Sequence, residues 1–187
     1  MGFPITLLYK RRNMNTLTQL AHSRKAWFIL LATALFLELT ALFFQHVMKL
    51  NPCVMCVYQR VAVFGLIFAG LLGMLQPKIW LVRFIAVIGW GISAIWGLKL
   101  AIELYNMQTY PSPFETCGFL PEFPHWLPLH QWFPSIFLPT GLCSEIPWSM
   151  LGLTMAQWMI FAFSLYIVAL VIFIWPVLRP NSHPNSK

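Results

Sequence analysis

Charged residues are scarce in this 187-residue chain, at 9% of the total, whereas hydrophobic residues make up 59%. Soluble domains average about a quarter charged residues. One soluble core cannot bury so much apolar surface, so the composition excludes an ordinary soluble protein and predicts a protein of the lipid bilayer. The net charge is +7. Because the basic residues flank apolar runs, they indicate orientation in a membrane and no nucleic-acid binding.

Four apolar runs stand out along the chain. They are residues 27–47, 57–75, 80–98 and 156–175. Each approaches the roughly 20 residues that a helix needs to cross the hydrocarbon. A spanning segment must satisfy its own backbone hydrogen bonds, which favours helices. We therefore predict an all-α membrane protein, a single domain built as a four transmembrane helix bundle.

The first run has two interpretations, a removable signal peptide or a retained span. It is longer than the usual core of a signal peptide, and Gln45-His46-Val47 is a poor cleavage site. We predict a retained span that follows a basic leader at residues 1–26. The polar tail at residues 176–187 is predicted to be disordered.

Basic residues are absent from residues 101–178. The leader before Trp27 holds five, and Lys78 and Arg83 lie at the turn between the second and third runs. The positive-inside rule therefore places both termini and the Lys78 turn in the cytoplasm.

The two remaining loops, about residues 48–56 and 101–155, then lie on the outer side. All four cysteines fall in these loops, namely Cys53, Cys56, Cys117 and Cys143. This distribution fits a compartment in which disulfides persist. The longer loop contains an apolar, aromatic cluster at residues 126–137. A short helix in the membrane interface and an ordinary ordered loop are equally compatible with that cluster and its prolines.

The segment Asn51-Pro52-Cys53-Val54-Met55-Cys56 opens the second run. Asn is a good helix N-cap and Pro is favoured at the first helical position, so we expect both cysteines in the first turns of a helix. The positive end of a helix stabilises a thiolate. The spacing also lets one sulfur resolve a bond made by the other, which predicts a redox pair.

Arg60 lies four residues after Cys56 and seven after Cys53, on the same helix face. An ionisable residue inside an apolar run is expensive and usually functional. The alternative is an arginine that reaches up to the headgroups. We favour a charge that stabilises a thiolate or an anionic reduced cofactor.

Two other readings of the cysteines remain. A metal site would need Cys117 and Cys143 as further ligands, and these lie 26 residues apart without a second close spacing. Two purely structural disulfides are also possible, although a multi-span bundle does not need such staples. The position at a helix start favours reactivity.

Several motifs occur in order over about residues 26–175. They are Glu38-Leu39-Thr40-Ala41-Leu42, Phe44-Gln45-His46-Val47-Met48, Pro52-Cys53 with Cys56 and Arg60, Tyr110-Pro111-Ser112-Pro113-Phe114 with Thr116-Cys117, Cys143, and Leu151-Gly152-Leu153 with Gln157-Trp158. Together they resemble DsbB, the family of bacterial inner-membrane disulfide bond formation proteins.

The resemblance implies a mechanism at the periplasmic face. A reduced DsbA-like protein would attack a Cys117–Cys143 disulfide at Cys117, giving a transient mixed disulfide. Electrons would then pass to Cys53 and Cys56, with the long loop bringing Cys143 toward Cys53. That pair would reduce a quinone, ubiquinone or menaquinone, with Arg60 nearby. A related variant with a different dedicated partner is possible. So is a protein of another class, a non-catalytic membrane scaffold or transporter subunit with structural disulfides.

Six further positions are polar or depart from the family pattern. Gln59 stands where the family often has Glu, and Leu104 where a His is often suggested as a quinone neighbour, so quinone contacts beyond Arg60 are not predicted. For Glu38 we favour a structural polar contact, and for His46 a place at the interface over a quinone contact. His125 and His130 have a poor metal spacing and are predicted at the surface.

Overall fold

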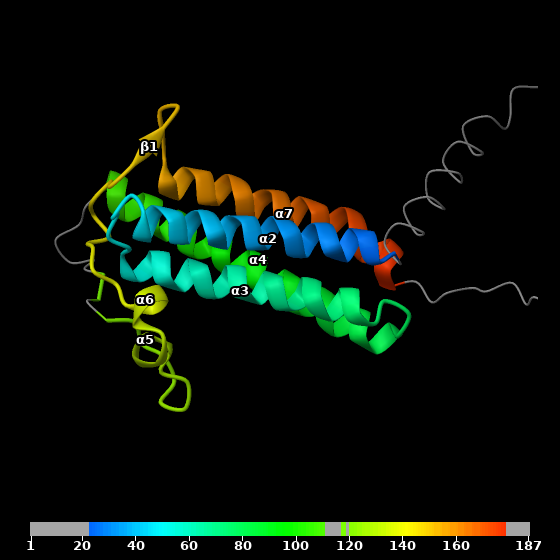
Figure 1. Cartoon of the computed structure of the whole chain (residues 1–187). Coiled ribbons are helices and arrows are strands. Elements are labelled where there is room, and N and C mark those ends of the chain that lie inside the picture. Colours follow the sequence, from blue (N-terminus) through cyan, green and yellow to red (C-terminus); the bar gives the residue numbers. More distant parts are fainter. Residues whose placement is uncertain (1–22, 111–116, 119, 179–187) are drawn as a thin grey trace, which may run out of the picture.

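The computed structural model describes residues 23–110, 117–118 and 120–178. Its elements are α2 (Arg24–His46), α3 (Val54–Leu75), α4 (Trp80–Thr109), α5 (Leu129–Trp132), α6 (Pro134–Phe137), β1 (Ser149–Met150), β2 (Leu153–Thr154) and α7 (Met155–Leu178). Four of these helices are long and apolar enough to cross a membrane. They lie side by side as a bundle (Figure 1), which confirms the predicted all-α membrane fold.

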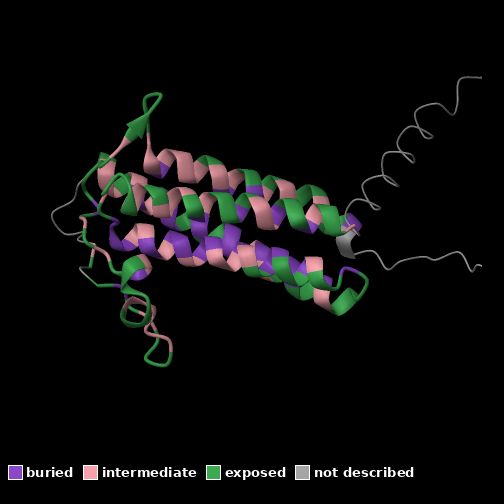
Figure 2. Ribbon diagram, in the orientation of Figure 1, coloured by how far each residue is buried: buried purple, intermediate pink, exposed green. Residues whose placement is uncertain are grey.

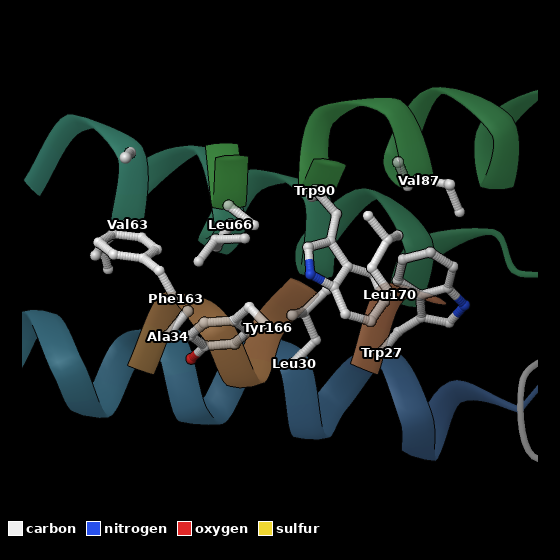
Figure 3. Close-up of a cluster of buried hydrophobic side chains, with 14 of the residues drawn as sticks. Trp27, Leu30, Ala34, Val63, Leu66, Val87, Trp90, Phe163, Tyr166 and Leu170 are labelled. Carbon is white, nitrogen blue, oxygen red and sulfur yellow. The ribbon is translucent and has the colours of Figure 1, made fainter. Parts of the chain in front are cut away.

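Packing in the bundle follows a simple chain of neighbours. Helix α3 contacts α2 and α4, and α4 contacts α7. Glycines let the helices approach closely, as small residues do in membrane bundles. A side chain at Gly70 would meet the backbone of Leu31, and one at Gly97 would meet the ring of Phe163. Buried side chains from all four helices fill the centre, where Trp27 packs edge-on against Trp90 (Figure 3).

Outward faces of the bundle stay apolar. Figure 2 shows exposed residues along the outer sides of α2 and α7, whereas α3 is exposed only near its end at Leu75. Phe28 and Phe36 of α2 and Val171 of α7 are among the exposed large hydrophobic residues. An apolar cavity of about 440 Å³ lies between α2, α4 and α7, lined in part by Trp27 and Tyr166. Such continuous apolar surface suits contact with lipid.

Two helix ends differ from the prediction. Helix α4 continues to Thr109, beyond the predicted end at residue 98. The apolar run stops at Lys99, but Lys99 pairs with Glu103 one turn later at 3.5 Å, and Leu100 and Leu104 are buried. Packing therefore extends this helix past the apolar run.

The predicted disordered tail begins too early. Helix α7 runs to Leu178, so residues 176–178 are helical. Pro176 lies in the last turn, where the loss of one backbone hydrogen bond does not end the helix at once. Residues 1–22 and 179–187, which hold most of the predicted leader and tail, lie outside the described residues.

The long loop lies at the end of the bundle where α2 ends and α3 begins (Figure 1). We call this the cysteine end. The loop contains two single-turn helices, α5 and α6, and a short antiparallel hairpin, β1–β2. Short helices are therefore present where the sequence left a helix and an ordered loop open, their place in the membrane interface stays a prediction, and the hairpin was not predicted.

Candidate functional site

Cys53 caps the start of α3. Its backbone is extended and its sulfur accepts a hydrogen bond from the backbone N–H of Cys56 at 3.3 Å. The two sulfurs lie 2.7 Å apart and are thiols. The predicted cap at Asn51 is therefore wrong, and Pro52 lies outside the helix. The Asn51 side chain accepts a hydrogen bond from the Thr140 hydroxyl at 3.3 Å instead of capping α3.

The surroundings of Cys53 favour its protonated thiol form. The hydrogen bond with Cys56 raises the pKa of the Cys53 thiol above its ordinary value, and burial raises this pKa further. Both effects favour the neutral form. Cys56 lies one turn into the helix, four residues before Arg60.

Arg60 is buried, with 6% of its surface exposed, so it does not reach up to the headgroups. Its Nη1 donates to the side-chain oxygen of Gln45 and, at 2.7 Å, to the carbonyl of Ile136 in α6. Its Nη2 donates to the Ala41 carbonyl at 3.3 Å. Arg60 lies four residues after Cys56 and seven after Cys53, on the same face of α3. One cation thus links α2, α3 and α6 beside the redox pair.

Glu38 lies one turn from Ala41 along the same face of α2. It is 4% exposed, and neither carboxyl oxygen has a hydrogen-bond partner among the described residues. No hydrogen bond among the described residues therefore supplies the expected structural polar contact. His46, by contrast, is exposed and its ring bonds the Leu42 carbonyl of its own helix.

The second cysteine pair forms a disulfide. Cys117 and Cys143 are joined, with their Cα atoms 6.0 Å apart. Cys143 is buried and Cys117 is half-buried. Both pack in one cluster with Cys53 and Cys56, together with Leu104 and neighbouring side chains. The two pairs, far apart in the sequence, therefore lie in one cluster at the cysteine end.

Backbone hydrogen bonds hold these pairs together. The N–H groups of Thr140 and Gly141 both donate to the Pro52 carbonyl, at 2.9 and 3.1 Å. A Cβ at Gly141 would lie 2.5 Å from the backbone oxygen of Asn51, so only glycine fits this approach. We call these contacts the 52–141 latch. It fixes the chain two residues before Cys143 against the residue before Cys53.

The remaining predicted positions differ in their surroundings. Gln59 is buried, and its side-chain nitrogen has no partner among the described residues. Leu104 packs in the cysteine cluster. His125 is exposed, and the ring of His130 stacks on Phe123. Residues 111–116, with most of the Tyr-Pro-Ser-Pro-Phe motif, lie outside the described residues.

Sequence reasoning missed the 52–141 latch and the partners of Arg60. Gln45 and Ile136 are separated from Arg60 by 15 and 76 residues. Two of the three oxygens around the guanidinium belong to the backbone, which any residue type supplies. Gly141, two residues before a cysteine, was the one visible sign that a close backbone approach was needed.

Comparison with known proteins identifies the family. The profile described as "Disulfide bond formation protein DsbB" matches residues 23–173. A protein named Disulfide bond formation protein B from Shewanella loihica is 64% identical over 168 residues, which are 90% of this chain and 98% of that relative. Its namesake from Shewanella amazonensis is 57% identical over 169 residues, covering 90% of this chain and all of the relative. The chain therefore belongs to the DsbB family of disulfide bond formation proteins, and it is a multi-pass membrane protein.

Proposed function

We propose that this disulfide-forming oxidoreductase reoxidises a periplasmic DsbA-like dithiol protein and passes the electrons to a membrane quinone, ubiquinone or menaquinone. The observation that carries the proposal is the single packed cluster that holds Cys53 and Cys56 together with Cys117 and Cys143. Thiol–disulfide exchange requires direct approach of one sulfur to another. Two purely structural cysteine pairs would have no need of such contact.

The exchange begins at Cys117, because Cys143 is the more deeply buried partner of the disulfide. A thiolate of the dithiol protein bonds to the Cys117 sulfur, and Cys143 leaves as a thiolate. Cys143 then attacks Cys53 of an oxidised Cys53–Cys56 pair, and Cys56 leaves as a thiolate.

The second thiol of the dithiol protein then displaces Cys117, which attacks Cys143 and releases Cys53. The dithiol protein leaves oxidised, Cys117–Cys143 is restored, and Cys53 and Cys56 are reduced. This final state has the same free thiols, Cys53 and Cys56, and the same Cys117–Cys143 disulfide as the structure.

Arg60 fits a role toward the quinone. A guanidinium carries five N–H donors, and three are used by Gln45, Ala41 and Ile136. The remaining donors suit a carbonyl oxygen, and the buried charge stabilises anions beside Cys56. A bound quinone supplies an acceptor for two electrons and two protons. Within the chain, Arg60 stabilises negative charge at Cys56, and Cys53 takes up a proton when Cys117 displaces it.

We further propose that the protein lies in the bacterial inner membrane with the cysteine end in the periplasm. Arg24, Lys25 and Lys78 lie at the opposite end of the bundle, and residues 101–178 carry no basic residue. This asymmetry follows the positive-inside rule, with both termini cytoplasmic. An impermeant thiol reagent added to intact spheroplasts should label the reduced cysteines. Labelling only after the membrane is opened would contradict this orientation.

The central test uses purified protein with a reduced DsbA-type protein and a soluble quinone. Quinone reduction is followed by absorbance, in the native chain and in Cys53→Ser and Cys117→Ser. Loss of activity in both variants is expected, because each removes one sulfur of the exchange. Full activity in both variants would refute the proposed relay, and no quinone reduction by the native chain would favour the scaffold alternative.

A further inference from the structure

The β1–β2 hairpin at the cysteine end has an unusual tip. Ser149 pairs with Thr154 and Met150 with Leu153, so the turn consists of Leu151 and Gly152. Both have positive φ, 56° and 79°. Two-residue turns of this kind favour Asn at the first position, because an Asn side chain tolerates the left-handed backbone and suits water. Here the position carries a branched apolar side chain.

The tip stands clear of the rest of the protein. Leu151 is 84% exposed, the highest value among the large exposed hydrophobic residues, and Met150 and Leu153 are also exposed. A Cβ placed on Gly152 would have no neighbour within 4 Å. No charged residue occurs from residue 146 to residue 178. Exposure to water therefore does not explain why the hairpin tip carries apolar side chains and no charge.

The hairpin continues the lipid-facing side of α7. The indole N–H of Trp158 donates to the Met150 carbonyl at 3.3 Å. The ring centroids of Trp158 and Phe161 lie 6.3 Å apart. Phe161 begins an exposed apolar stripe that continues through Leu165 and Val168. These positions, three or four residues apart, share one face of the helix. Met150 therefore lies at the top of a surface that faces acyl chains.

The hairpin is also held at a fixed height. Thr154 and Gln157 form a reciprocal cap, in which each backbone N–H bonds the side-chain oxygen of the other, at 2.8 and 3.4 Å. The hairpin thus joins the first turn of α7 directly. In Figure 1 it projects sideways from the bundle at this level, across the helix axes and not along them.

We infer that the tip of this hairpin, Met150 to Leu153, inserts among the phospholipids of the leaflet at the cysteine end. Insertion removes three apolar side chains from water and requires no charge to be desolvated. It fixes the depth of the segment that leads from Cys143 into α7. A soluble partner or a second copy of the chain would leave the continuity with the α7 stripe unexplained.

The test places the photoreactive residue benzoylphenylalanine at position 151 of the full chain, reconstituted in vesicles of phosphatidylethanolamine and phosphatidylglycerol. Illumination should add the mass of one phospholipid. The matched control carries the probe at Glu145, an exposed charged position six residues earlier, where no lipid adduct is expected. Equal lipid adducts at both positions, or a cross-link from 151 to a second copy of the chain, would overturn the inference.

A second pair of variants separates charge from turn geometry. The probe is moved to position 153, and Leu151 is replaced by Asp or by Asn, both of which tolerate positive φ. L151D should lose most of the lipid adduct, because a carboxylate resists entry into the leaflet. L151N should keep more of it than L151D. Equal adduct in the two variants would contradict insertion of the tip.

Discussion

Gly141→Ala, which replaces one Cα hydrogen by a methyl group, should slow the exchange between the two cysteine pairs. The added Cβ would lie 2.5 Å from the Asn51 backbone oxygen, whereas ordinary contact begins near 3.4 Å. A backbone oxygen cannot rotate away, so the loop must retreat by about 1 Å. Both hydrogen bonds to the Pro52 carbonyl then lengthen, each contributing about 1 kcal/mol.

The expected magnitude follows from this retreat. A misplacement of reacting groups by about 1 Å can cost roughly 100-fold in rate, and about 2 kcal/mol of lost latch energy corresponds to roughly 30-fold. We expect the step from Cys143 to Cys53 to slow by about 10- to 100-fold. Rapid mixing with a reduced dithiol partner, acid quenching and mass-tagging of free thiols at each time measures this step.

Gly118→Ala is the matched control. It adds the same methyl group beside the other cysteine of the disulfide, where the new Cβ would meet the Leu120 oxygen at an ordinary 3.6 Å. Its exchange rate should match the native chain. A small dithiol that reduces Cys53–Cys56 directly should support normal quinone reduction in both variants. If G141A and G118A exchange at the same rate while the native relay works, the latch has no role in positioning.

Three further variants test the site and the bundle. Arg60→Met should raise the apparent KM for quinone more than the KM for the dithiol partner, and an unchanged quinone KM would remove its assigned role. Gln45→Ala removes one of the three acceptors of Arg60 and the donor to the Ser135 carbonyl. Backbone hydrogen exchange in α6 should therefore accelerate at least severalfold. Unaltered exchange would mean that other contacts hold α6. Gly97→Ala would bring a methyl within 2.2 Å of the Phe163 ring. It should lower the free energy of unfolding by about 1–3 kcal/mol, measured by thermal unfolding. Gly89→Ala, whose new Cβ would lie 3.8 Å from the Cβ of Ala69, should leave the stability unchanged.

The spans and the cysteine end could be predicted because their causes are compositional. Apolar runs and the absence of basic residues from 101–178 are visible in the sequence. The extension of α4 depends on the burial of Leu100 and Leu104, which appears only when the neighbouring helices are in place. Composition therefore located the membrane core well and the ends of the helices less well.

The contacts between distant segments could not be predicted. The 52–141 latch joins backbone groups 88 and 89 residues apart, and backbone groups carry no residue-type information. The hairpin was missed because its turn is Leu151-Gly152, without the usual Asn-Gly pattern. The charged side chains were better predicted, since Arg60 and Glu38 stand out wherever an apolar run surrounds them.

The cap on α3 makes a backbone amide responsive to redox chemistry. The N–H of Cys56 is satisfied by the sulfur of Cys53, and a side-chain cap contributes about 1 kcal/mol to a helix start. Each time that sulfur exchanges its bonding partner, its strength as an acceptor changes, and the first turn of α3 tightens or loosens with it. The amide resonance of Cys56 should therefore act as a spectroscopic reporter of turnover, readable by NMR without any added label. The first turn of α3, which carries Cys53 and Cys56, would then change its hydrogen bonding at each exchange step.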